Sequence, residues 1–341
     1  MQGFNVANIT KWLLANIDNV VAPFSVELIA GGRSNLTFLV TDGAGRKLVL
    51  RRPPLGHVLA TAHDMAREYR IIAAVGKTSV PVPPALGLCT DLEVNDAPFY
   101  VMGHVDGVVL DSAERAAALP RELRVPASEH LVHVLADLHA VDIDAIGLGD
   151  LARREGYIER QLKRWSDQWE RSKTRELPSI DRVRDALSRM LPAPLPTTIA
   201  HGDYRLSNCM MSPNGAVAGV LDWELCTLGE PMADVGGLLG YWFDPNDPDE
   251  GGDAMTTGLP GFLSAEEMAG LYAQQMKVPM ASVSYYRAFA QWRLACIGEG
   301  VLARYLAGQQ GEQGETMNLD AYRDAIPRRA AKAARLLGIA V

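Results

Sequence analysis

Apolar and polar residues alternate along several stretches of the first hundred positions, and a period of two is typical of half-buried β-strands. The strand-like runs cover residues 26–30, 36–40, 47–51, 85–88 and 98–102. The first three runs are joined by short turns and therefore predict an antiparallel meander. Apolar residues at helical spacing predict two short helices in the same part of the chain, at residues 9–17 and 63–75.

Helical spacing of apolar residues dominates after position 112. The predicted helices cover residues 129–140, 157–171, 180–191, 233–242, 265–276, 282–306 and 320–337. Because the predicted strands lie in the first part of the chain and most of the predicted helices in the second, we expect an α+β fold with two lobes. We expect a small antiparallel-sheet N-terminal lobe, residues 1–103, and a larger, mainly helical C-terminal lobe, residues 104–341, with the ligand site in the cleft between them.

Composition narrows the functional class. The 341 residues are 48% hydrophobic and carry a net charge of −8, which disfavours a general role in nucleic-acid binding. The four cysteines form no CxxC pair, so we expect isolated reduced thiols. No basic, apolar leader and no apolar run of about 20 residues is evident, so we expect a cytoplasmic protein without a membrane partner.

Residues 199–224 carry the strongest chemical signal. A polar loop with Asp203 is followed by a strand, a tight turn at residues 213–215 and a second apolar strand that ends at Asp222. Because a hairpin returns the chain to its starting point, we expect Asn208 and Asp222 to be neighbours, with Asp203 close by. An amide and a carboxylate oxygen suit Mg²⁺ on the phosphates of ATP, and a second carboxylate can take the proton of an acceptor hydroxyl.

The amino-acid sequence of this segment resembles the motifs of a known family. His201-x-Asp203, Asn208 five residues later and the hairpin ending in Asp222 resemble the catalytic loop and metal-binding aspartate of protein-kinase-like folds. His-Gly-Asp-Tyr-Arg-Leu-Ser-Asn and Leu-Asp-Trp-Glu are similar to the aminoglycoside phosphotransferase and choline kinase branch. The connector at 80–84 and the helix end at 138–142 add to this likeness. Over nearly its full length the chain resembles the phosphotransferase domains associated with acyl-CoA dehydrogenases.

The resemblance implies a role for each polar residue of the loop. Asp203 would be the catalytic base, and Asn208 and Asp222 would hold Mg²⁺. His201 would brace the loop by hydrogen bonding. For Arg205 two roles stay open, a contact with the transferred phosphate and an ion pair with a nearby carboxylate.

Kinase-like folds also place a basic residue on the third strand, where it pairs with the nucleotide phosphates and with a helix glutamate. By strand alternation Arg51 is that residue and Glu68 its partner. The family's usual residue is lysine, and arginine differs from it in bulk and shape. Glu224 follows the metal aspartate, where capping or bracing of the loop is favoured over a contact with the metal.

The remaining nucleotide contacts are expected in two segments. The turn between the first two strands could present the main-chain N–H groups of Gly32 to Ser34 to a phosphate. Residues 100–105 should form the hinge between the lobes, with Met102 and His104 near the adenine.

These observations predict an ATP- and Mg²⁺-dependent phosphotransferase acting on a hydroxyl of a small molecule. The acceptor stays open among aminoglycosides, choline-like alcohols, sugars and hydroxyacyl thioesters, the last favoured by a functional link to acyl-CoA dehydrogenases. The alternative is a non-catalytic nucleotide- or CoA-binding module on the same fold. A protein kinase is disfavoured because helix-forming sequence resumes about ten residues after Asp222.

Overall fold

The computed structural model describes residues 3–30, 35–55, 64–243, 256–308 and 318–340. By the density of their internal contacts the residues separate into two compact units. The first unit comprises Met1–Asp106 together with Ala218–Glu224, and the second comprises Gly107–Val217 and Leu225–Val341. The lobe boundary expected after residue 103 stays a prediction.

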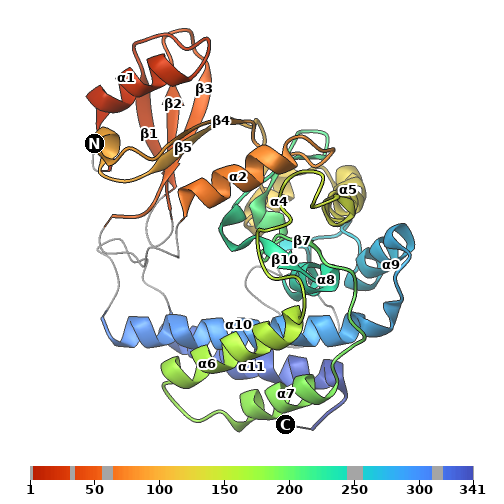
Figure 1. Cartoon of the computed structure of the whole chain (residues 1–341). Helices are drawn as coiled ribbons and strands as arrows, with labels where there is room; N and C mark the ends of the chain where they lie inside the picture. The colour runs from red at the N-terminus through yellow and green to blue at the C-terminus, as the bar shows by residue number, and fades with distance from the viewer. Residues whose placement is uncertain (1–2, 31–34, 56–63, 244–255, 309–317, 341) are drawn as a thin grey trace. The chain divides into compact units, whose positions relative to one another are not determined.

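The first unit is built on a five-stranded antiparallel sheet (Figure 1). Its strands are β1 (Ser25–Ala30), β2 (Leu36–Thr41), β3 (Lys47–Arg52), β4 (Ala85–Cys89) and β5 (Phe99–Gly103), in the order β1-β2-β3-β5-β4. The meander expected from the alternation is therefore present as β1, β2 and β3. Among its described residues this unit contains the helices α1 (Val6–Asn16), α2 (Met65–Val75) and α3 (Leu92–Asn95).

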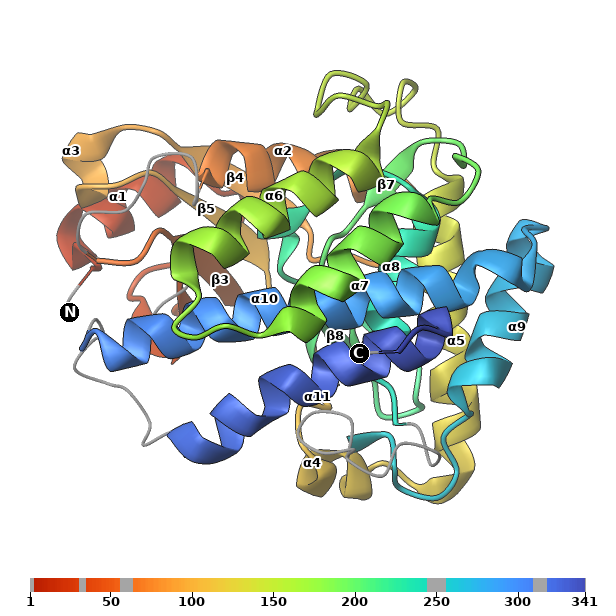
Figure 2. The same cartoon turned by 90° about the horizontal axis from the view of Figure 1, so that it is seen from below.

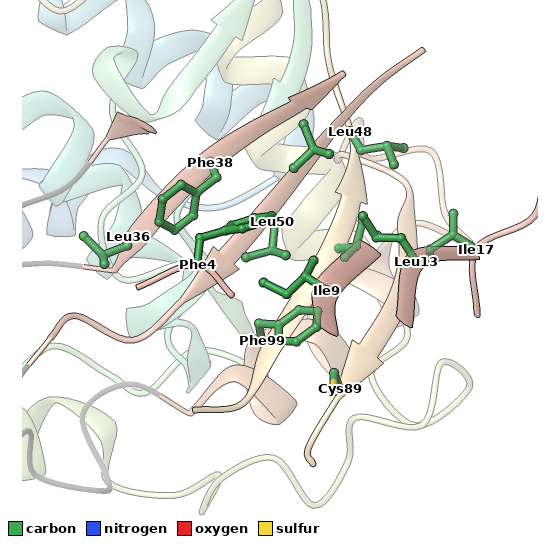
Figure 3. Packing of buried hydrophobic residues seen from close by; sticks show 12 residues of the cluster. Phe4, Ile9, Leu13, Ile17, Leu36, Phe38, Leu48, Leu50, Cys89 and Phe99 are labelled. Atoms are coloured by element: carbon green, nitrogen blue, oxygen red, sulfur yellow. The ribbon is translucent and has the colours of Figure 1, made fainter. Parts of the chain in front are cut away.

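One face of this sheet is covered by α1, and the two share a hydrophobic core (Figure 3). The side chain of Asn5 caps α1 by accepting a hydrogen bond from the Asn8 N–H. The core side chains come from both elements and include Ile9, Leu13, Phe38, Leu48, Leu50 and Phe99. Burial of each such side chain stabilises the fold by about 1.5–3 kcal/mol. Because Leu48 and Leu50 fill this core, alternation directs Arg51 to the opposite face of the sheet.

The second unit is mainly helical. Its helices are α4 (Ala113–Ala118), α5 (Arg121–Ala140), α6 (Tyr157–Ser172), α7 (Pro178–Arg189), α8 (Pro231–Gly240), α9 (Ala265–Met276), α10 (Val283–Leu306) and α11 (Leu319–Leu337). The long helix α10 packs against α6, α8 and α11 (Figure 2). Of the aromatic residues on α10, Tyr286, Phe289 and Trp292 are fully buried and belong to the core.

Short strands in the second unit position the loop that was singled out in the sequence. β7 (Thr198–Ala200) pairs with β10 (Thr227–Gly229), and β6 (Val108–Val109) pairs with β8 (Cys209–Met211). A hydrogen bond from the Ser212 N–H to the Ala216 carbonyl closes the turn between β8 and β9 (Val217–Val220). β6, β7 and β10 were not predicted, because two or three residues display no period and, unlike β8, none of these strands adjoins the turn at residues 213–215.

Two expectations on the whole chain can be compared with the described residues. All four cysteines are buried and unbridged, as expected for isolated thiols. No helix in the described ranges combines the length and the apolar character needed to cross a bilayer.

Candidate active site

The backbone of the candidate catalytic loop is fixed by one buried carboxylate. The loop follows β7, and α8 follows the paired strand β10, so the first turn of α8 brings Asp234 beside it. Asp234 Oδ2 accepts a hydrogen bond from the His201 N–H at 2.6 Å, and Oδ1 accepts one from the Gly202 N–H at 2.9 Å. Asp234 is 3% exposed. The carboxylate thus replaces solvent for two successive amides of the loop.

A buried histidine and tyrosine support Asp234 from the other side. His139 Nε2 lies 3.4 Å from Asp234 Oδ2, and His139 Nδ1 lies 2.7 Å from the hydroxyl oxygen of Tyr272. Burial alone would raise the pKa of Asp234, but the contact with His139, the His201 ring and the Gly202 amide together hold this pKa below its ordinary value. The sequence interpretation did not assign His139 or Asp234. The helix end at 138–142, which contains His139, was the available signal.

Glycine is required at position 202. Its backbone has φ +83°, a region that residues with a side chain rarely adopt. A Cβ atom there would also lie 2.7 Å from the Leu225 carbonyl oxygen. Gly202 therefore allows the loop to pass close to the backbone that follows Glu224.

Asp203 and Asn208 are bonded to each other within the loop. Asn208 Nδ2 donates to Asp203 Oδ2 and to the Asp203 carbonyl, both at 2.9 Å. Arg205 Nε lies 3.3 Å from Asp203 Oδ2, and the Arg205 guanidinium lies 4.7 Å from the centre of the Tyr241 ring. Of the two possibilities for Arg205, the structure thus contains the carboxylate contact. Asp203 Oδ1 and Asn208 Oδ1 accept no hydrogen bond within the described part of the chain.

In the first unit a single arginine contacts three carboxylates. Arg51 Nη2 lies 2.5 Å from Asp222 Oδ1 and 3.6 Å from Glu224 Oε2, and Arg51 Nε lies 3.2 Å from Glu68 Oε2. The expected pairing of Arg51 with Glu68 is therefore present. Asp222 has φ +63°, so the backbone turns sharply where strand β9 has ended.

Burial sets the ionisation of this cluster. Glu68 is 2% exposed, and burial raises its pKa, although Arg51 and the hydroxyl of Tyr100 oppose the rise. The Tyr100 hydroxyl donates to Glu68 Oε2 at 3.1 Å, and burial raises the pKa of Tyr100 as well. Burial would lower the pKa of Arg51, but the surrounding acidic groups raise it overall. Arg51 is therefore a permanent cation.

Asn35 links two of these carboxylates and was missed in the sequence. Its Nδ2 lies 3.0 Å from Glu68 Oε1 and 3.3 Å from Glu224 Oε2. Glu224 therefore braces its segment against Arg51 and Asn35, in agreement with the expectation of a bracing role. No local pattern singles out Asn35 beyond its place at the end of the glycine turn.

The other predicted nucleotide contacts have different outcomes. Gly32 and Ser34 lie outside the described residues. Met102 is a buried residue of β5 and pairs with Val49 of β3. His104 Nδ1 lies 3.3 Å from Asp106 Oδ1, just after β5. Proximity of Met102 and His104 to an adenine stays a prediction.

Two cavities in the second unit adjoin the loop. One is lined by the loop residues Gly202 and Asp203 and by Tyr241 and Arg293. The other is lined by Arg205, Ser207, Tyr241 and Trp242, among others. Tyr241 contributes to both. Trp242 thus lines a cavity, although its side chain is as buried as those of Tyr286 and Trp292 on α10.

The donor set that could hold Mg²⁺ consists of oxygen atoms. Within the described ranges no group of three or more His, Cys, Asp or Glu residues is arranged to bind a metal. Asn208 uses its amide nitrogen inside the loop, which directs its oxygen away from those bonds. Asp222 bonds Arg51 through Oδ1 and has Oδ2 available. An amide oxygen and a carboxylate oxygen fit Mg²⁺, which prefers hard oxygen ligands and needs few from the protein. Asn208 and Asp222 belong to different units, and their mutual proximity stays a prediction.

The antiparallel sheet, the helical unit and the His201–Asn208 loop define a protein-kinase-like phosphotransferase fold. Residues 25–268 match the model of the phosphotransferase enzyme family, and the chain belongs to this family. The resemblance seen in the sequence is thereby confirmed.

Individual relatives agree with this assignment. Acyl-CoA dehydrogenase family member 10 of Mus musculus is 36% identical over 82% of the chain. A solved structure from Ralstonia eutropha, provisionally described as an aminoglycoside phosphotransferase, is 32% identical, covers 98% of both chains and has a TM-score of 0.82. Aminoglycoside phosphotransferase APH(4)-Ia in complex with ADP and hygromycin B is 18% identical, covers 98% of this chain and all of its own (100%), and has a TM-score of 0.61, which supports the fold alone.

The chain matches only part of its curated relatives. It spans 26% of the mouse protein and 39% of an Arabidopsis thaliana relative named as a probable acyl-CoA dehydrogenase. Its own sequence therefore corresponds to a part of those longer proteins.

Proposed function

We propose that this chain transfers the γ-phosphoryl group of ATP, with Mg²⁺, to a hydroxyl group of a small molecule. The observation that carries the proposal is the loop geometry. Asp203 has one carboxylate oxygen bonded to Asn208 and the other available, on a backbone fixed by Asp234. Family membership supports the reaction class.

Asp203 would act as the base. Its unbonded oxygen accepts the proton of the acceptor hydroxyl while the hydroxyl oxygen forms a bond to the γ-phosphorus and the bond to ADP breaks. Asn208 and Arg205 keep the carboxylate oriented through the other oxygen. Because the transition state is loose, orientation and charge neutralisation supply most of the acceleration.

Asn208 and Asp222 would hold Mg²⁺, which supplies positive charge next to the phosphates when it is bound. Arg51 would contribute a second cation on the nucleotide side, as the lysine of the third strand does in related folds. Glu68, which accepts a hydrogen bond from the Tyr100 hydroxyl, holds Arg51 on the sheet face opposite to the core. Complexes of a fold relative with ADP support nucleotide use.

For the acceptor, we favour a hydroxyacyl thioester. Support comes from the names of the curated relatives, in which a domain of this kind occurs in acyl-CoA dehydrogenase family members. We also propose that the protein is located in the cytoplasm and is functionally linked to an acyl-CoA dehydrogenase. Aminoglycosides, sugars and amino alcohols are the comparison classes in a screen.

The test is an ATP-consumption screen with Mg²⁺ across these four acceptor classes, followed by Asp203→Asn. Asparagine keeps the size of the side chain but cannot take the proton, so turnover should fall about 10²- to 10⁴-fold while ADP affinity stays within about twofold. Asp167→Asn, on an exposed turn of α6, is the matched control. Near-normal turnover of Asp203→Asn would reject the role of the base.

A non-catalytic binding module remains the competing function, and the direct contact of Arg51 with Asp222 favours it, because the contact occupies one oxygen of a proposed metal ligand. Thermal-shift measurements with ATP, Mg²⁺ and CoA distinguish the two. Stabilisation by ligands without transfer to any acceptor class would support the binding module.

A further inference from the structure

The peptide group between Gly202 and Asp203 is held on both of its polar sides. Its carbonyl oxygen accepts a hydrogen bond from Arg293 Nη2 at 2.6 Å. Its N–H, which belongs to Asp203, donates to His201 Nδ1 at 3.3 Å. Arg293 lies on α10, 91 residues further along the chain, so this contact joins the loop to a distant helix.

Arg293 is itself well placed to act as a fixed donor. Its guanidinium lies 5.7 Å from the centre of the Trp165 ring on α6, a cation–π distance. It lines the same cavity as Asp203 and Tyr241. Within the described ranges Arg293 forms no ion pair with a carboxylate, and its hydrogen-bond partner is the Gly202 carbonyl.

The Gly202–Asp203 peptide plane needs a restraining contact, because a glycine next to it allows the plane to rotate easily. The peptide plane rotates through the ψ angle of Gly202 and the φ angle of Asp203, and a residue without Cβ allows a wide range of ψ. Rotation of this plane swings the Cα–Cβ bond of Asp203 and therefore its carboxylate. A charge-assisted hydrogen bond to the carbonyl resists that rotation more strongly than a neutral one.

Asp234 does not perform the same task. Asp234 accepts from the His201 and Gly202 N–H groups, so it fixes the two preceding peptide groups. Arg293 fixes the next one along the chain. Successive peptide planes rotate about different bonds, so the two contacts restrain different motions of the loop.

We infer that Arg293 is a positioning residue for the phosphoryl-transfer site, which holds the Gly202–Asp203 peptide plane and through it the direction of the Asp203 carboxylate. The inference rests on the proposed function of Asp203 for its effect on turnover. The geometric part, a peptide plane held by Arg293, can be tested without any acceptor.

The experiment compares Arg293→Met, Arg293→Gln and Arg293→Lys in the full chain. The matched control is Arg304→Met, the same change at an exposed site near the end of α10. Hydrogen–deuterium exchange at the Asp203 amide reports the peptide plane, and kcat, the acceptor KM and the ADP Kd report function. Thermal unfolding of each variant shows whether it is folded.

For Arg293→Met we expect exchange at the Asp203 amide to rise about tenfold, the effect of losing one charge-assisted hydrogen bond. We expect kcat to fall about 10- to 100-fold, with KM and the ADP Kd within about twofold, since misplacement of the base affects the transition state. Arg293→Lys should recover part of both effects, and Arg304→Met should show neither.

Unchanged exchange in Arg293→Met would overturn the inference, and so would a loss confined to KM, which would make Arg293 a substrate contact. If Arg293→Met does not fold, the Gln and Lys variants decide by the same criteria. If the unmodified protein transfers phosphate to no acceptor, the proposed function fails, whereas the exchange measurement still decides whether Arg293 holds the peptide.

Discussion

Arg51 Nη2 lies 2.5 Å from Asp222 Oδ1, so the cation of β3 is bonded directly to a carboxylate that we propose as a metal ligand. The same guanidinium reaches Glu68 through Nε at 3.2 Å. The planar guanidinium group of an arginine can contact Glu68 and Asp222 at once, whereas the ammonium group of a lysine is a single point charge. The arginine at this position, in place of the family's usual lysine, therefore links α2 to the segment that carries Asp222.

This linkage predicts different effects for two substitutions of Arg51. Arg51→Lys keeps one ion pair and should lower the free energy of unfolding by about 1–2 kcal/mol. Arg51→Met leaves Glu68, which is 2% exposed, without its cation and should cost about 3–5 kcal/mol and weaken ADP binding at least about tenfold. Urea unfolding and calorimetry measure these effects, with Lys47→Met on the exposed start of β3 as the control. Equal stability of the two Arg51 variants would contradict the three-carboxylate role.

A second prediction concerns Asp234 and pH. Its pKa in the folded protein is lower than in the unfolded chain, so its ionised form contributes stability that is present above the ordinary value of 3.8 and is lost as pH falls through the folded pKa. Asp234→Asn should cost about 3 kcal/mol at neutral pH, because one of two amide contacts is lost and His139 faces no charge. The difference from the unmodified protein should shrink only below pH 3.8. If the difference in unfolding free energy between the two proteins stays constant as the pH falls well below 3.8, the charge of Asp234 is not what stabilises the loop.

A third prediction separates two glycines. Gly202→Ala should destabilise the protein by about 2–4 kcal/mol and abolish measurable turnover, since a Cβ meets the Leu225 carbonyl at 2.7 Å and φ is +83°. Gly270→Ala, in α9, meets no atom within 4 Å and should stabilise the protein by about 0.5–1 kcal/mol. Thermal unfolding and the ATP-consumption assay report both. A tolerated alanine at position 202 would mean that the loop can leave the backbone path described above.

A fourth prediction tests the histidine behind the loop. Tyr272→Phe removes the hydroxyl that lies 2.7 Å from His139 Nδ1 and should cost about 1–3 kcal/mol and reduce kcat severalfold. Tyr285→Phe removes a comparable buried hydrogen bond, to the Leu187 carbonyl at 3.1 Å, which involves neither a loop residue nor His139. It should lower stability by a similar amount with no change in kcat. If both variants reduced kcat equally, the loss of activity would follow from reduced stability of the whole protein and not from the contact with His139.

The elements that could be predicted from the sequence are those whose pattern is local. In β2 and β3 the side chains that pack on α1, namely Leu36, Phe38, Val40, Leu48 and Leu50, are spaced two residues apart, which is the spacing of one face of a strand. The residues from His201 to Asn208 form a contiguous motif, so the candidate site residues in this loop could also be predicted from the sequence. Short strands such as β7 and β10 have no such pattern, because the pairing itself and not a periodic face defines them.

The contacts that escaped prediction join residues far apart in the chain. Asn35 and Glu224 are separated by 189 positions, and His139 and Asp234 by 95. Each of these side chains is ordinary in its local sequence, a polar residue in a turn or near a helix end. Only the fold brings them together. The pairing of Arg51 with Glu68 could be predicted because the family pattern states it, whereas the contact with Asp222 could not.

The composition of the first unit has a consequence for synthesis. Residues 218–224 belong to this unit, and Asp222 is made 171 residues after its partner Arg51. On the ribosome, the five strands emerge with Glu68 as the nearby counter-ion of Arg51, and the other two acids arrive only after α4, α5, α6 and α7 have been made. A nascent chain that stops at residue 106 therefore contains the residues of the sheet and its core but lacks two of the three carboxylates that contact Arg51.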